Sequence, residues 1–466
     1  MSASVALVWF RNDLRLHDHA PLVAALRAHA VVVPVFVLDP ALLAETDFGW
    51  RKTGSARLAF MLEAVADLRA SLRARGSNLV VSHAAPAQAL ATLAQQVGAT
   101  AVYATGYATP EEQRDERRVA KALATLGATL HLSYGHPLLH PDDLPDRVTP
   151  LPEIFTQWRK EVERRLKVRQ PLPAPGKLPA LPASVEAGAL PTLASLGYES
   201  LPRAAEADYA AEGGETAGLA HWEAYLEAEY LSTYKETRNG LLGMPFSSKL
   251  SAWLAQGCLS PRQIYWDIKR YEAEVASNES TYWLVFELLW RDYFYYVARQ
   301  YGSRLFRPGG LRGHETRKLR RDRGTLEAWR TGQTGVPLVD ACMRQLLATG
   351  FMSNRGRQNV ASYQVHDLHQ DWIYGASWFE HALVDYDPAS NWANWCYVAG
   401  VGNDPRPSRK FNVVKQGYDY DPDGAFVRHY LPELKGVPNH AIHEPHRLSP
   451  LEAQALGMQF AEPLHL

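Results

Sequence analysis

The chain has 466 residues, a net charge of −1 and a pI near 7.0. This length is enough for about two or three domains, and the near-neutral charge excludes a globally basic nucleic-acid binder but not a local basic patch. The three cysteines form no CxxC pair, which argues against a disulfide framework or a cysteine-rich metal site. Neither a signal peptide nor a long uncharged apolar run is recognisable, so we expect a cytoplasmic protein without a membrane span.

Strands and helices alternate in the first third of the chain. Strands are predicted at residues 5–10, 30–38, 79–82, 101–104 and 130–132, and helices at 17–28, 54–75, 86–97 and 110–126. Such alternation is typical of an α/β domain with a parallel five-stranded sheet, which we place at residues 1–135. The first strand is followed by RNDLRLHD instead of GxGxxG, so a standard dinucleotide site is not expected there.

The remainder divides into a linker and a helical region. Residues 136–216 are rich in Pro, Ala, Gly and Leu, which predicts a semi-rigid linker on the surface. Helical periodicity then predicts an all-α domain at residues 217–440 and a short tail at 441–466. The predicted helices cover residues 217–233, 246–256, 260–275, 278–301, 324–330, 336–348, 355–369 and 376–383.

The stretch DYDPASNWANW, residues 385–395, combines two carboxylates, two amides and two tryptophans. Buried polar groups need partners, so this cluster predicts contact with a large polar aromatic ligand. Asp385 and Asp387 could instead hold a metal or act as an acid/base pair, and a polar loop with aromatic anchors is the simplest alternative.

Three other groups also indicate a ligand site. Hydroxyls and a lysine before an apolar helical run are typical of a phosphate site, although a plain helix cap has the same pattern; these residues are Ser247, Ser248, Lys249, Leu250 and Ser251. Glu287, Trp290 and Arg291 share one helix face, where a desolvated Glu287 would have a raised pKa; a surface Glu–Arg pair over a buried Trp is the alternative. The same spacing recurs in Asn354, Arg357 and Gln358. These three polar side chains could bind a ligand, pair with Asp385 and Asp387, or form a helix-capping network.

A basic run lies at Arg317, Lys318, Arg320, Arg321 and Arg323. Such a run is usually a solvated face. With aromatic residues nearby it could follow a nucleic-acid backbone.

Taken together, several long motifs resemble the photolyase/cryptochrome family, and their details are similar to its DASH cryptochrome branch. The motifs are VWFRNDLRLHDH, SSKLSAWLAQGCLSP, ELLWRDYF, GFMSNRGRQNVAS and DYDPASNWANWCYVAGVGNDPR, with YKETRN and NESTYW. They occur in the family's order from Val5 to Leu434. Within that span the resemblance leaves aside the linker.

The resemblance implies a flavin adenine dinucleotide (FAD) bound in the helical domain. Tyr234 and the Ser247–Ser251 run would hold the pyrophosphate, and Arg357 with Asp385 would form a pair beside the flavin ring. Asp387 would contact the ring or the adenosine, and Asn391 would face the reactive ring nitrogen, where an amide favours the reduced flavin. Because Asp385 and Asp387 would then contact the flavin, a metal site at these two residues is less favoured. We also expect Glu287, Arg291 and Asn354, which would line the same pocket, to be among the FAD-binding residues.

The resemblance also implies a DNA substrate. Glu287, Trp290, Asn354 and Gln358 match a pocket for a flipped pyrimidine dimer, with Trp290 stacked on the lesion and Tyr397 as the opposite wall. Basic residues for the DNA phosphates would be Arg238 and Arg409.

Photoreduction of the flavin would run through Trp395 and then Trp372. In the family a third tryptophan completes this chain, but Leu319 occupies the corresponding position here. We therefore expect a different or slower route. The α/β domain would carry a light-harvesting antenna, often a folate (methenyltetrahydrofolate), beside Glu112, for which a solvated helix face is the alternative.

Two functions follow from the resemblance. The first is light-driven repair of cyclobutane pyrimidine dimers, preferentially in single-stranded or looped-out DNA, by electron transfer from excited reduced FAD. The second is a blue-light photoreceptor that uses the same flavin. Asn391, the Glu287–Trp290–Asn354 pocket and the absence of a long tail favour repair. Ala- and Arg-rich usage indicates a bacterial source, and we expect a monomer.

Overall fold

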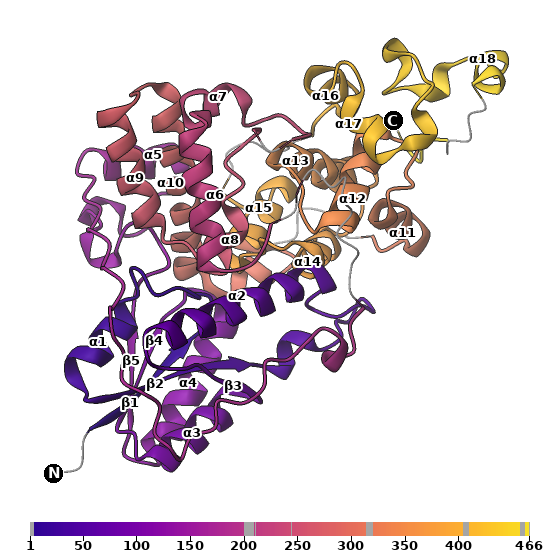
Figure 1. Ribbon diagram of the computed structural model, residues 1–466. Helices are drawn as coiled ribbons and strands as arrows, with labels where there is room; N and C mark the ends of the chain where they lie inside the picture. Colours follow the sequence, from indigo (N-terminus) through magenta and orange to yellow (C-terminus); the bar gives the residue numbers. More distant parts are fainter. Residues whose placement is uncertain are drawn as a thin grey trace.

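Five apolar runs pair as parallel strands in the computed structural model, which describes residues 4–199, 209, 211–243, 245–313, 320–403, 410–456 and 462–465. The strand order is β3-β2-β1-β4-β5, so the chain crosses over between β3 and β4 (Figure 1). This confirms the predicted parallel α/β sheet. The strands are β1 (Val5–Phe10), β2 (Val31–Leu38), β3 (Val80–His83), β4 (Ala101–Thr105) and β5 (Thr129–Ser133).

Helices cover both faces of this sheet, as the apolar character of both sides of β1 requires. Ala6, Val8 and Phe10 join one core cluster with side chains of α1 and α2, whereas Leu7 and Trp9 join another with side chains of α3 and α4. Alternate residues of a strand point to opposite faces, so each helix pair has its own set of partners. The helices are α1 (Ala20–Ala28), α2 (Ser55–Ala74), α3 (Pro86–Val97) and α4 (Pro110–Ala124).

The segment predicted as a surface linker contains a helix, α5 (Phe155–Glu163), in which Trp158 is fully buried. The prediction was wrong here because Phe155, Trp158 and Val162 form an apolar helical face within a Pro-rich composition. The later part of the segment does follow the α/β domain. The Val81 N–H donates to the Ala187 carbonyl at 2.9 Å, which places this part beside β3.

The region after residue 215 is helical, which confirms the all-α prediction, and none of its helices that the structure describes has the length and apolarity to cross a bilayer. The expected helix at 246–256 shortens to α8, and five further helices, α7 and α15 to α18, were not predicted. The helices are α6 (Glu215–Glu227), α7 (Tyr234–Thr237), α8 (Ser251–Ala255), α9 (Pro261–Glu274), α10 (Glu279–Tyr301), α11 (Arg323–Thr331), α12 (Pro337–Thr349), α13 (Asn354–Ser362), α14 (Trp372–Ala382), α15 (Pro388–Ala399), α16 (Val413–Tyr420), α17 (Ala425–Tyr430) and α18 (Pro450–Ala455).

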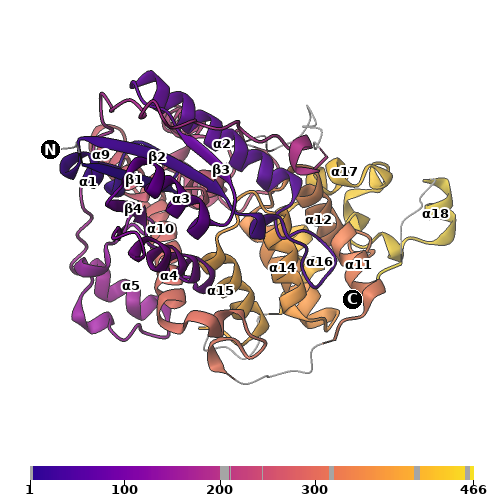
Figure 2. The ribbon, with the colours of Figure 1, turned by 90° about the horizontal axis from the view of Figure 1, so that it is seen from below.

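The two regions pack against each other along α2, which lies between the sheet and the helical region (Figures 1 and 2). In this interface the Arg57 guanidinium donates to the Glu380 carbonyl in α14 at 2.9 Å. The fully buried carboxylate of Asp18 binds the Arg262 guanidinium of α9 at 2.7 and 2.8 Å. It also accepts the Leu172 N–H at 2.9 Å, so one side chain joins the α/β domain, the connecting segment and α9.

We expect Asp18→Ala to lower the free energy of unfolding by about 3–5 kcal/mol, because Arg262 would remain buried without its partner. Burial alone would raise the pKa of Asp18, but Arg262 and Arg15 outweigh this effect and hold it below its ordinary value. The stabilisation is therefore present above the unfolded-state pKa of about 4 and is lost as the pH falls through the folded-state pKa.

Denaturant titrations of both proteins at several pH values measure this difference. Asp419→Ala, which breaks the exposed pair with Lys415, is the control and should change little. A loss as small as that of the control would contradict the expected role of Asp18.

Candidate functional site

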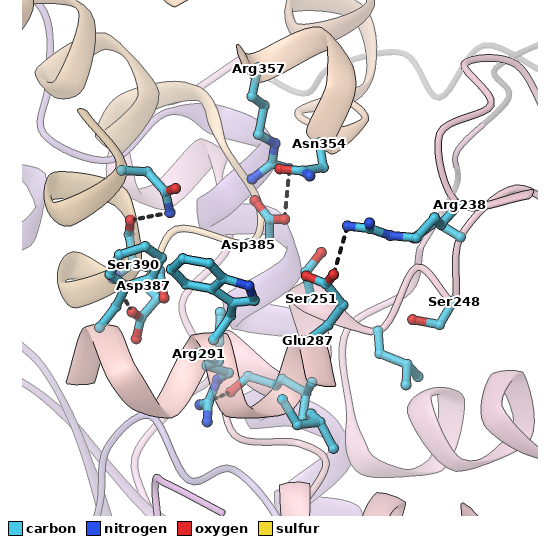
Figure 3. Close-up of a pocket in the computed structure, with 18 of the residues that line it drawn as sticks. Arg238, Ser248, Ser251, Glu287, Arg291, Asn354, Arg357, Asp385, Asp387 and Ser390 are labelled. Atoms are coloured by element: carbon cyan, nitrogen blue, oxygen red, sulfur yellow. Dashed lines mark hydrogen bonds and ion pairs between the residues drawn. The ribbon is translucent and has the colours of Figure 1, made fainter. Parts of the chain in front are cut away.

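A cavity of about 480 Å³ lies between α7, α8, α10, α13 and α15 (Figure 3). Its volume falls within the range of roughly 300–1,000 Å³ that is usual for cofactor and ligand sites. Most of the side chains predicted from the sequence line it, although they come from distant parts of the chain. These are Tyr234, Arg238, Ser247, Ser248, Lys249, Leu250, Ser251, Glu287, Trp290, Arg291, Asn354, Arg357, Gln358, Asp385, Asp387 and Tyr397.

A smaller cavity of about 120 Å³ adjoins the first and shares Arg357, Asp385 and Asp387 with it. Asn391 and Trp395 line this second cavity. The predicted site therefore has two parts that share lining residues.

The loop before α8 forms one wall of the large cavity. Ser247 and Lys249 adopt left-handed backbone conformations, with φ of +67° and +55°. A left-handed residue followed by the right-handed Leu250 directs successive N–H groups to one side, which makes an anion-binding concavity. Because α8 has only five residues, the loop, and not a long helix dipole, is the feature suited to phosphate.

Arg357 and Asp385 form an ion pair beside both cavities, with 2.7 Å between Nη2 and Oδ2. Asp385 is buried, and its other oxygen, Oδ1, has no hydrogen-bond partner among the described residues. A buried acceptor without a donor is costly to the fold. A ligand that donates a hydrogen bond here would satisfy it.

Glu287 pairs with Arg238 across the cavity at 2.7 Å (Figure 3). Burial raises the pKa of Glu287, although the Arg238 guanidinium opposes this rise. The alternative of a surface pair between Glu287 and Arg291 is wrong. Arg291 instead donates to the carbonyl oxygens of His136 at 2.7 Å and of Leu254 at 3.1 Å, so it anchors two wall segments.

Aromatic and amide groups occupy the side of the cavity around α10, α13 and α15. The half-buried Trp290 meets Tyr397 edge-to-face, with ring centroids 6.4 Å apart and planes at 79°. Asn354, the first residue of α13, is exposed, and Gln358 one turn later accepts a hydrogen bond from Arg355 at 3.0 Å. An indole and two amides beside a carboxylate are suited to a flat polar ring.

Asp387 is held by His136, which sequence reasoning missed. His136 Nε2 lies 3.1 Å from Asp387 Oδ2, while Oδ1 accepts the Ser390 N–H at 2.7 Å and caps α15. Burial would raise the pKa of Asp387, but the hydrogen bond and charge of His136 keep it low. Asp387 before Pro388 is a recognisable start for α15, whereas nothing near His136 in the sequence pointed to this partner.

The expected electron-transfer residues are buried in the helical region. The Trp395 ring contacts Phe379 and Trp329, with centroids 5.2 and 6.2 Å away, and Trp372 contacts Trp392 at 6.0 Å. The Asn391 amide donates to the Ala376 carbonyl at 3.0 Å.

One predicted residue that the structure describes, Glu112, lies apart from this assembly. Glu112 is on α4 in the α/β domain, where it accepts a hydrogen bond from Thr109. Leu319 and Arg409 lie outside the described residues, as do Arg317 and Lys318 of the basic run.

Comparison with known proteins places both regions in one family. Residues 6–177 match the family model described as DNA photolyase, and residues 283–464 match the one described as FAD binding domain of DNA photolyase. The Cryptochrome DASH of Gloeobacter violaceus is 52% identical over 460 residues, covering 98% of this chain and 92% of the relative. That of Synechocystis is 47% identical, covering 97% and 92%.

Solved structures give the same result. The Synechocystis cryptochrome superposes with a TM-score of 0.96 at 46% identity, covering 99% of this chain and 96% of that one. A bacterial class III photolyase from Agrobacterium tumefaciens gives 0.86 at 29% identity, covering 100% and 95%. Identity this high over nearly the whole length is decisive. The chain belongs to the photolyase/cryptochrome family, in its cryptochrome DASH branch.

Proposed function

We propose that this protein repairs cyclobutane pyrimidine dimers in DNA with light, preferentially where the DNA is single-stranded or looped out. The observation that carries the proposal is the position of Glu287 and Trp290, which line the same cavity as the Arg357–Asp385 pair. A carboxyl and an indole suited to a pyrimidine thus lie beside a site suited to a flavin.

The two cavities fit FAD in four respects. The left-handed loop at Ser247 and Lys249 suits the pyrophosphate, and Asp385 Oδ1, which has no partner in the described part of the chain, suits a ring N–H donor. Arg357 balances the charge of Asp385 at 2.7 Å, and Asn391 presents an amide at the smaller cavity. When bound and reduced, FAD would supply the electron that splits the dimer under blue or near-ultraviolet light.

Residues around the mouth of the cavity would receive the flipped dimer. Trp290 would stack on one pyrimidine with Tyr397 as the second wall, while Asn354 and Gln358 would offer amide groups to the base edges. Glu287 would donate a hydrogen bond to a pyrimidine carbonyl, which requires its protonated form. Burial raises the pKa of Glu287 against the charge of Arg238, which is the direction that this role requires.

The preference for single strands follows from the cost of bringing a base into this cavity. Extrusion from a duplex requires unpairing and unstacking, whereas a single strand avoids most of that cost. Arg238 and Arg409 would contact phosphates. Arg238 already has a carboxylate partner at 2.7 Å, so its phosphate contact would compete with Glu287.

The photoreceptor function is the second candidate, since the relatives are named cryptochromes and both functions would use the same flavin. A folate antenna beside Glu112 belongs to the proposal as well. Its support is the position of α4 near the interface, where Lys52 pairs with Glu111 of α4 and lies 3.6 Å from Glu380 of α14.

Arg357→Ala should lower the flavin content of the purified protein, because Asp385 would keep a buried charge without its cation. The ratio of flavin to protein absorbance measures this content. Arg344→Ala, which removes a pair with Glu433 away from both cavities, is the control and should retain flavin. Equal flavin in both variants would show that the Arg357–Asp385 pair does not hold the cofactor.

Light should remove dimers from an oligo-thymidine, faster in the single-stranded form than in a duplex, and darkness should not. Glu287→Ala should slow repair roughly 10- to 100-fold, the effect of losing a hydrogen bond to a developing charge. Glu327→Ala, at an exposed position of α11, is the control. Repair is measured by dimer loss after photoreduction. A flavin-loaded, fully reduced protein that repairs neither substrate would overturn the proposal and favour the photoreceptor.

Leu319→Trp should accelerate photoreduction of the oxidised flavin, because it supplies the third indole that the family's electron route contains. Repair by protein reduced chemically beforehand should stay unchanged, since only activation depends on this route. Flavin absorbance during blue illumination with an external thiol reductant follows the reaction. Identical photoreduction rates in the two proteins would mean that another residue already completes the route.

A further inference from the structure

One face of α10 is lined with aromatic rings. Tyr282, Phe286, Trp290 and Tyr293 are spaced by four, four and three residues, so they lie on one side of the helix. Helix α5, from the segment between the two regions, packs against this face, and Figure 1 shows the two helices together. Phe286 and Trp290 also line the large cavity, so the packing of α5 reaches the candidate site.

The closest aromatic contact in this packing joins Phe155 to Trp290. Their ring centroids are 3.6 Å apart and their planes are only 15° from parallel. Phe155 is buried, whereas Trp290 is half-buried. Trp290 therefore has one face stacked on a fixed ring, while Tyr397 approaches it with planes at 79°.

Both ends of α5 are tied to α10, which keeps the Phe155 ring in place. Tyr293 donates its hydroxyl proton to the Glu153 carbonyl just before α5 begins. Near the other end, Arg159 donates to the Tyr282 hydroxyl at 2.8 Å, and that hydroxyl donates to Glu163 at 2.5 Å. The support under Trp290 is thus anchored before and after Phe155.

We infer that Phe155 is a positioning residue that holds the Trp290 indole in the plane needed to stack on a damaged base. This inference rests on the proposed function, because it assigns Trp290 a pyrimidine dimer as its ligand. An aromatic side chain ordered before binding spares the substrate the cost of ordering it. The connecting segment is then part of the lesion-binding site and not only a link between domains.

Phe155→Leu tests the inference, because it keeps an apolar side chain but removes the flat ring. We expect roughly three- to tenfold weaker binding of a dimer-containing single-stranded oligo-thymidine in the dark, the range for loss of an aromatic pair. Binding of the undamaged oligo-thymidine and flavin content should stay unchanged. If Phe155→Leu does not fold, Phe155→Met, which is similar in bulk and also lacks the ring, takes its place.

Two comparisons separate positioning from a general loss of structure. In a Trp290→Ala background, Phe155→Leu should have no further effect on dimer binding, since it acts through the indole. Phe426→Leu is the control, because it makes the same change to a buried ring of α17 that contacts Tyr430 and lines neither cavity, and it should leave dimer binding near that of the unaltered protein.

The outcomes distinguish this inference from the proposed function. Two results would overturn the role of Phe155 but not the proposed function. The first is unaltered dimer binding in Phe155→Leu, and the second is a further loss of dimer binding when Phe155→Leu is added to Trp290→Ala. An unaltered protein that binds damaged and undamaged oligo-thymidine equally would overturn both.

Discussion

Carboxylates buried at the junctions of distant segments set the arrangement on which the site depends. A buried carboxylate must receive hydrogen bonds or pair with a cation, so the stable fold places beside each one a segment that supplies these donors. Asp18 pairs with Arg262, and Asp292 of α10 accepts the N–H groups of Leu138 and Leu139 at 2.8 and 2.7 Å. The start of the connecting segment is thereby pinned to the helix that carries the candidate site. The same requirement joins Asp387 to His136, which the Asp292 contacts bring into place.

Stability and geometry have different sources here. One continuous apolar cluster runs from Phe10 in the sheet to Trp395 in α15, so the two regions share a core, and burial of that core supplies most of the favourable free energy. Buried ion pairs contribute little net free energy, because desolvation offsets their attraction. The ion pairs instead exclude alternative packings, so the segments that form the cavity walls keep their relative positions.

The two sides of the candidate site differ in how fully their side chains are paired and packed. On the side proposed for the flavin, Asp385 retains an oxygen without a partner among the described residues, which is a cost that a bound donor would remove. On the side proposed to receive DNA, Glu287 is paired with Arg238 and the Trp290 ring stacks on Phe155. The side proposed for the cofactor thus keeps a buried acceptor to be satisfied, whereas the side proposed for the substrate is already ordered. This division suits a cofactor that stays bound and a substrate that must enter and leave.

The sequence alone determined the sheet, because its apolar runs are short, continuous and separated by amphipathic helices, a pattern that depends on nearest neighbours. It also indicated the residues of the cavity, since Asp385, Trp290 and Arg357 are polar or aromatic groups placed where an ordinary core would not have them. Only the tertiary structure decided that Glu287 pairs with Arg238, that His136 holds Asp387 and that α5 supports Trp290. The partners in the last two contacts are more than 100 residues apart in the chain. Local periodicity carries no information about such pairs, because they form only when packing brings separate segments together.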